Sequence, residues 1–259
     1  MDRGASMSRI ARFGLVGILL LAAAVRLAYF HERALQPDFL HPVSDADFHD
    51  YWARALVSGD WTPKPGFPDP QVPTTPFFRP PGYPYFLAAL YRATGSSIRA
   101  AVVVQLLLGV ANAGLAFGVG RRRRGARAGP LFAAFMAVHW SFVYFEGELL
   151  EPSLLATLTL LFLGSLGRWI ERPGLAAGLL AGFPAGALAL VRPNLLAVAA
   201  GLAPWAGWMI LKNPLRRRPL LLAAGGFAAA LLLTLAPAAI RNYRAAGDRV
   251  LITSNAGIN

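Results

Sequence analysis

Two acidic segments carry the side chains of this sequence that are best suited to chemistry. The first begins DADFHDYWA at Asp45 and holds three aspartates and one histidine. On a helix, Asp45 and His49 would share a face because they are four residues apart. A carboxylate near apolar walls binds its proton more tightly, so Asp45, or Asp47 in its place, could act as a general base. These groups could also hold a divalent cation, or simply favour the dipole of a surface helix.

The second acidic segment, FEGELLEP, runs from residue 145 to residue 152 and contains Glu146, Glu148 and Glu151. Its structural interpretation is a helix start, with Pro152 in the first turn. Its functional interpretation depends on the first segment. If Glu148 converges with Asp45, the two carboxylates form an acid–base site or a site for a divalent metal ion.

Arginines beside proline turns are the candidate phosphate ligands. Arg79 lies in FRPPGYP and Arg192 in VRPN, and a guanidinium pairs with phosphate through two parallel hydrogen bonds. The alternative for Arg79 is a rigid extended turn. Arg241 follows the last apolar run, where it either anchors that run or contacts a phosphate. For Arg26, inside the first apolar run, we expect a side chain that extends to the membrane interface.

Several classes of protein are excluded. The chain has no cysteine, so thiolate metal sites and cysteine nucleophiles are absent. It contains no phosphate-binding glycine-rich loop, HExxH zinc pattern or GxSxG nucleophile motif. A net charge of +12 would suggest nucleic acid for a soluble protein, but these basic residues lie in short runs between apolar segments. We therefore expect membrane lipids, and not nucleic acid, as the partner of the basic residues.

The elements that position these residues are membrane helices. Of the 259 residues, 56% are hydrophobic, and they gather in runs long enough to cross a bilayer. Helix is the expected conformation because an open strand in lipid leaves its backbone groups without hydrogen bonds. The sequence predicts an all-α polytopic bundle, one transmembrane domain over residues 1–259, with seven spans near 13–30, 98–119, 129–145, 152–169, 174–191, 195–211 and 220–240.

Basic clusters fix the predicted orientation. They occupy alternate connections, at Arg3–Arg12, Arg121–Arg127, Arg168–Arg172 and Lys212–Arg218, so one topology places all of them in the cytoplasm together with the N-terminus. The first span lacks a clear cleavage site and is expected to be retained. The loop 31–97, the acidic corner at 146–151 and the tail 241–259 then lie outside. Only Asp2 and Glu171, of 13 acidic residues, fall on the cytoplasmic side.

The long outer loop is predicted to contain two short helices. Residues 45–57 place Phe48, Trp52 and Leu56 on one helical face, and Ser44 is a plausible N-cap. Residues 61–83 are rich in proline and have no helical period. Residues 84–94 are apolar and aromatic but too short to span, which favours a helix lying in the outer interface.

The motifs as a set resemble the N-terminal half of bacterial GT-C membrane glycosyltransferases, the families of dolichyl-phosphate-mannose protein mannosyltransferases and aminoarabinose transferases. The resemblance covers the whole chain. It is carried by DADFHDYWARALVSGDW, FRPPGYPYFLAALYRATG, VQLLLGVANAGLAFGVGRR, YFEGELLEPSLL, GALALVRPN and IRNYRAAGDRVLITSNAGIN.

That resemblance implies an enzyme of the bacterial inner membrane that transfers a hexose or pentose, with inversion, at its outer face. The donor would be a polyprenyl-phosphate-linked sugar and the acceptor a protein, lipid or glycan. By matching the motifs, Asp45 becomes the base, with Asp47 as alternative. Glu148 matches the acid of the GEL corner, and Glu146 stands where the family often has aspartate. His49 occupies a position where tyrosine is common, and the resemblance implies that both His49 and Glu146 contact the substrate or its phosphate.

The matched basic residues are Arg79 and Arg192, with Arg241 as a further phosphate contact. A divalent cation on Asp45 and Glu148 is an open alternative, and no other cofactor is expected. Similar proteins continue past SNAGIN, so we expect the sequence to be a truncated form. Two other hypotheses stay open: a transporter or flippase of the same lipid-linked sugar, and a non-catalytic subunit or inactive fragment.

Overall fold

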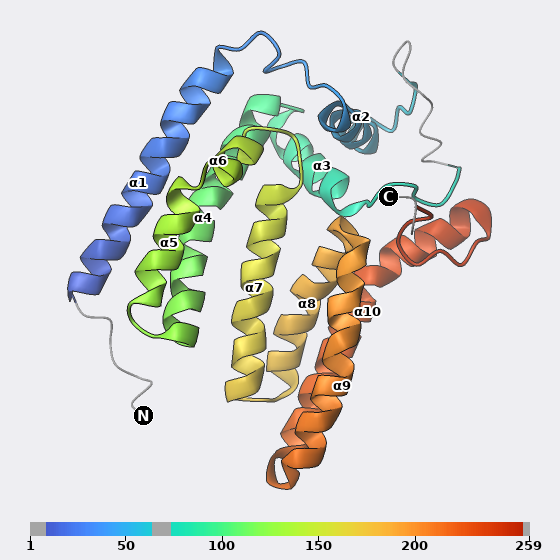
Figure 1. The fold of residues 1–259 in the computed structure, drawn as a ribbon. Coiled ribbons are helices and arrows are strands. Elements are labelled where there is room, and N and C mark those ends of the chain that lie inside the picture. The colour runs from blue at the N-terminus through green and yellow to red at the C-terminus, as the bar shows by residue number, and fades with distance from the viewer. Residues whose placement is uncertain (1–8, 64–73, 256–259) are drawn as a thin grey trace. The chain divides into compact units, whose positions relative to one another are not determined.

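The computed structural model describes residues 9–63 and 74–255, and over these ranges the chain folds into helices without a strand (Figure 1). The α-helices are α1 (Arg9–Ala34), α2 (Asp45–Ser58), α3 (Gly82–Thr94), α4 (Ile98–Arg124), α5 (Ala128–Val138), α6 (Trp140–Glu146), α7 (Pro152–Glu171), α8 (Leu175–Val191), α9 (Leu196–Lys212) and α10 (Arg217–Ala246). Short 3-10 turns, η1 (Pro193–Leu195) and η2 (Pro214–Arg216), precede α9 and α10.

The prediction of an all-helical membrane bundle is confirmed at the level of helix length and apolarity. Each of the seven predicted spans coincides with helix. In the described part of the chain, five helices are long and apolar enough to cross a bilayer, and the bent pair α5–α6 would be a sixth. Helix α8 is apolar but has 17 residues, fewer than the roughly 20 that a membrane helix needs.

The third predicted span is not one straight helix. Its two halves, α5 and α6, meet at an angle of 52°. His139 lies between them with an extended backbone, φ −67° and ψ 114°, which interrupts the helical hydrogen bonds. The sequence around His139 contains no proline or glycine that would have signalled this break.

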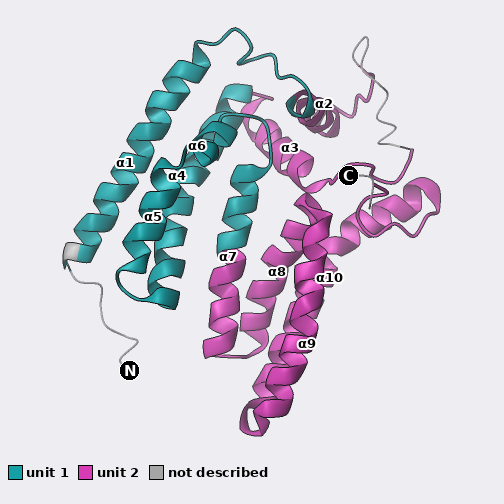
Figure 2. Cartoon of the chain, viewed as in Figure 1, with its two compact units in different colours: residues 1–46, 98–160 teal, residues 47–97, 161–259 magenta. Residues whose placement is uncertain are grey.

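The chain divides into two compact units, coloured separately in Figure 2. Unit 1 comprises residues 1–46 and 98–160, and unit 2 comprises residues 47–97 and 161–259. In unit 1, helices α1, α4 and α5 pack on one another around a core that consists mainly of alanines. Its buried residues are Ala22, Ala113, Ala116 and Ala137, whose small size lets the helix backbones approach closely, together with Met136.

In unit 2, helices α8 and α10 pack along a stripe of glycines. Gly178, Gly182 and Gly186 lie four residues apart on α8. A Cβ atom added to Gly178 would lie 2.0 Å from the carbonyl oxygen of Ala223, and one on Gly182 would lie 2.3 Å from that of Phe227. The two helices are therefore in contact backbone to backbone, as small-residue motifs permit in membranes.

Both short helices predicted for the loop 31–97 are present, α3 within unit 2 and α2 almost wholly within it. Helix α2 starts at Asp45 as predicted, and α3 starts two residues before the predicted Pro84. Ser44 has a φ of 56°, in the left-handed region, whereas an N-cap residue usually has extended backbone. Trp52 of α2 is buried against Phe77 and Ala238, so the apolar face of α2 is a packing face.

Candidate functional site

Arg79 and His49, two of the predicted substrate-binding residues, lie on adjoining segments of unit 2. The Arg79 guanidinium lies over the ring of Phe48, 4.5 Å from its centroid. The ring of His49 lies 4.8 Å from that of Tyr83, which follows the proline turn. These contacts hold α2 against the segment from residue 77 to residue 85, a pairing that no local sequence pattern predicts.

Arg241 occupies an unusual environment for a cation. Its guanidinium lies 4.1 Å from the centroid of the Phe77 ring and donates a hydrogen bond to the carbonyl oxygen of Thr75. A second, longer hydrogen bond of 3.3 Å reaches the side-chain oxygen of Asn242. Within the described residues, no carboxylate contacts this half-buried side chain. Arg241 thus keeps its positive charge available for an anion.

Asn242 orders the segments around Arg241, and sequence inspection missed it. Its amide is fully buried and accepts a hydrogen bond from the Phe77 backbone N–H at 3.0 Å. The amide nitrogen donates to the carbonyl oxygens of Val250, at 3.2 Å, and Ile252, at 2.9 Å. One side chain on α10 therefore holds two loop segments in place. The available signal was an asparagine directly after an apolar run.

The turn that follows Arg79 lies against the end of α8. A Cβ atom on Gly82 would come within 2.7 Å of the backbone of Leu190 and Val191, so only glycine fits there. Arg192 is the next residue after α8 and is exposed, with an extended backbone. The predicted arginines Arg79, Arg192 and Arg241 consequently come from segments that pack together within unit 2.

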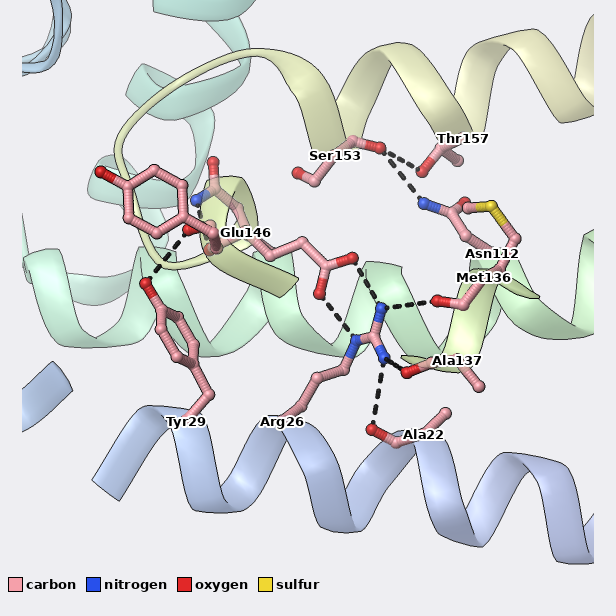
Figure 3. Close-up of polar contacts among 11 residues, drawn as sticks. Ala22, Arg26, Tyr29, Asn112, Met136, Ala137, Glu146, Ser153 and Thr157 are labelled. Carbon is pink, nitrogen blue, oxygen red and sulfur yellow. Dashed lines mark hydrogen bonds and ion pairs between the residues drawn. The ribbon is translucent and has the colours of Figure 1, made fainter. Parts of the chain in front are cut away.

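The acidic corner belongs to unit 1, and the side chain of Glu146 is buried within that unit. The Glu146 side chain is buried and accepts two hydrogen bonds from Arg26, at 2.7 Å and 2.8 Å (Figure 3). Arg26 is 2% exposed and also donates to the carbonyl oxygens of Ala22, Ala137 and Met136. The expectation that Arg26 extends to the membrane interface is therefore wrong, because a buried ion pair and three carbonyls satisfy it within the protein.

Glu148 is also paired with an arginine that the sequence did not single out. Arg33 of α1 donates to the Glu148 carboxylate at 3.0 Å and to Asp38 at 2.9 Å. The Glu148 side chain keeps 20% of its surface exposed, so it is held without being enclosed. Only the acidic corner was visible in the sequence, since its basic partners are more than 100 residues away.

The aspartates of α2 differ in exposure. Asp45 is exposed at the first residue of the helix, and Asp47 is half-buried. Asp50 is buried and accepts hydrogen bonds from Arg54 and from the Tyr91 hydroxyl, which makes it a structural residue. Burial, and next the hydrogen bond to Asp50, raise the pKa of the Tyr91 phenol.

The metal hypothesis for Asp45 and Glu148 stays a prediction. In the described ranges, no group of three or more histidine, aspartate and glutamate side chains is arranged to hold a metal ion. A cation bound by these two carboxylates would need its remaining ligands from water or substrate.

Comparison with known proteins gives no assignment: no protein-family model and no curated protein matches the chain.

Proposed function

We propose that this chain is a GT-C-type glycosyltransferase that transfers a sugar from a polyprenyl-phosphate carrier to an acceptor at the outer face of a bacterial inner membrane. The observation that carries the proposal is Arg241, a half-buried cation contacted by an aromatic ring and a carbonyl oxygen but, in the described residues, by no carboxylate. A desolvated guanidinium of this kind binds phosphate strongly.

Arg79 and Arg192 support the same ligand. Arg79 lies on the segment that packs against the ends of α8 and α10 in unit 2, and Arg192 directly follows α8. In the proposed reaction, negative charge develops on the carrier phosphate as its bond to the sugar breaks. Cationic groups that are already in place stabilise that charge without reorganisation. The isoprenoid tail of the carrier would lie among the apolar helices.

The exposed carboxylate of Asp45 is the proposed general base, with Asp47 as the alternative. The base would take the proton from the acceptor hydroxyl as its oxygen attacks the anomeric carbon on the face opposite the phosphate. A new bond between that oxygen and the sugar forms, the bond between the sugar and the phosphate breaks, and the configuration inverts. The polyprenyl phosphate leaves with the bonding electron pair. Glu148 would orient the acceptor, and His49 would contact the sugar or its phosphate.

The test uses the purified chain in liposomes, supplied with a radiolabelled polyprenyl-phosphate hexose or pentose and an envelope extract as acceptor. Wild type should move label to the acceptor. Asp45→Asn should lower the rate about 10²- to 10⁴-fold, the range typical of a lost general base. Full activity in Asp45→Asn would refute the role of Asp45. The matched control is Asp60→Asn, an aspartate of the same loop that we assign no role.

A second variant separates binding from chemistry. Arg241→Gln should raise the KM for the lipid-linked donor, whereas the exposed Arg92→Gln should leave it unchanged. Movement of the labelled lipid across the bilayer without transfer would indicate a flippase. Neither transfer nor movement would leave a non-catalytic subunit or an inactive fragment.

A further inference from the structure

Three side chains along α1, here called the α1 stripe, contact three consecutive residues of the acidic corner. Arg26, Tyr29 and Arg33 lie three and then four residues apart, so they share one face of the helix. Arg26 pairs with Glu146 through two hydrogen bonds, at 2.7 Å and 2.8 Å, and Arg33 pairs with Glu148 at 3.0 Å. The two ion pairs are thus two helical turns apart on α1 but only two residues apart in the corner.

Tyr29 fills the space between the ion pairs. A Cβ atom on Gly147 would lie 2.4 Å from the Tyr29 ring, so the ring packs directly on the backbone of the corner. The Tyr29 hydroxyl donates to the carbonyl oxygen of Tyr144 at 3.2 Å. Residues Glu146, Gly147 and Glu148 are therefore each contacted by their own member of the α1 stripe.

Helix α4 holds the corner from another direction. The Gln105 amide donates to the backbone carbonyl oxygens of Glu146, at 3.0 Å, and Glu148, at 2.7 Å. A Cβ atom on Gly109 would come within 2.2 Å of the Glu146 carboxylate, so this glycine provides the space for that side chain. The corner comes after the end of α6, where regular backbone hydrogen bonding stops. These side chains supply the partners that the helix no longer provides.

We infer that the stripe Arg26–Tyr29–Arg33 is a positioning element that fixes the Glu148 carboxylate for sugar transfer, an inference that rests on the proposed function. A group that orients a reactant must be held to within about 0.5 Å of its productive place, and a segment outside regular helix is not held by its own backbone. Arg33 sets the position of the carboxylate through the hydrogen bond to it at 3.0 Å. Arg26, through Glu146, fixes the backbone two residues earlier.

The experiment compares Arg33→Gln and Arg33→Lys with wild type, with the exposed Arg92→Gln as the matched control for a lost charge. In the transfer assay, Arg33→Gln should lower kcat about 10- to 100-fold, as misplacement of a positioned group does, with the KM for the lipid donor within about twofold. Arg33→Lys should restore part of kcat. The double variant Arg26→Gln/Glu146→Gln leaves no unpaired charge, and it should show the same loss of kcat.

A second measurement does not depend on activity. Because the sequence has no cysteine, Leu150→Cys provides a single site for a nitroxide label on the corner. Its electron paramagnetic resonance spectrum should show restricted motion in the wild-type background and faster motion in Arg33→Gln and in the double variant.

The outcomes distinguish a failure of the positioning role from a failure of the proposed sugar-transfer function. An active wild type together with an Arg33→Gln variant of unchanged kcat overturns the positioning role. A wild type that transfers no sugar refutes the proposed function and, with it, the catalytic purpose of the stripe. The nitroxide spectra then decide alone whether the stripe holds the corner, and identical spectra in all variants overturn that too.

Discussion

The close packing of α8 against α10 along the glycine stripe predicts that replacing Gly178 by alanine destabilises the protein, whereas the same replacement at Gly225 does not. In the structure, the Cβ atom of Gly178→Ala would lie 2.0 Å from the Ala223 carbonyl oxygen, although non-bonded heavy atoms pack best at about 3.5–4.0 Å. The neighbouring atom belongs to the backbone of α10 and cannot rotate away. The helices would therefore have to separate by about 1 Å or more, and their other contacts along the stripe would weaken.

The magnitude follows from two opposing effects. Overpacking of a tight contact costs about 1–3 kcal/mol, whereas alanine in a helix is favoured over glycine by about 1 kcal/mol. Gly225 is the control because it lies in α10 and has no atom within 4 Å of an added Cβ. Gly225→Ala should be neutral or stabilising by up to about 1 kcal/mol. The helix preference for alanine applies at both positions, so the two variants should differ by the overpacking cost alone, about 1–3 kcal/mol.

The assay is thermal unfolding of the purified chain in detergent, followed by tryptophan fluorescence. Trp169 is a local reporter, since its ring lies 5.5 Å from that of Phe227 on α10. At about 2–4 °C per kcal/mol for a chain of this size, Gly178→Ala should unfold roughly 2–12 °C below Gly225→Ala. A Gly178→Ala variant that unfolds at or above the wild-type temperature would refute the close packing of these backbones.

Three further predictions concern buried polar groups. Tyr91→Phe removes the hydroxyl that donates a hydrogen bond to Asp50 and should cost about 1.5–3 kcal/mol of stability. Because the pKa of Tyr91 is raised, this contribution to stability should persist up to about pH 10 and be lost above it. The ultraviolet phenolate titration of the two proteins checks this pH dependence. Arg26→Gln should destabilise by about 3–5 kcal/mol because it leaves Glu146 buried and unpaired, and adding Glu146→Gln should recover part of that loss in a double-mutant cycle of melting temperatures. Asn242→Ala should cost about 1–3 kcal/mol and increase limited proteolysis of the loop segments that its amide holds, and an unchanged digestion pattern would contradict its role.

Local physics determined the helical framework from the sequence. A run of about 20 apolar residues has few alternatives to helix in lipid, so all seven runs are helical in the structure. The short helices α2 and α3 were also predictable, because their periodicity and their glycine and proline boundaries are local signals. The acids and arginines in the segments between the apolar runs were recognised as candidates for the same reason: their chemistry is visible in the residue types.

Only the tertiary structure decided which of these groups are partners. Arg26 and Glu146 are 120 residues apart, and Phe77 and Asn242 are 165 apart, so no periodicity links them. The break at His139 likewise has no local cause; Arg26 supplies hydrogen bonds to carbonyl oxygens near the end of α5, and that arginine belongs to another helix. A buried charge needs a partner of opposite charge, from any part of the chain that the fold places beside it, because leaving it unpaired costs several kcal/mol. Residue types therefore indicated the candidate groups, and packing decided that Arg26 pairs with Glu146 and Arg33 with Glu148.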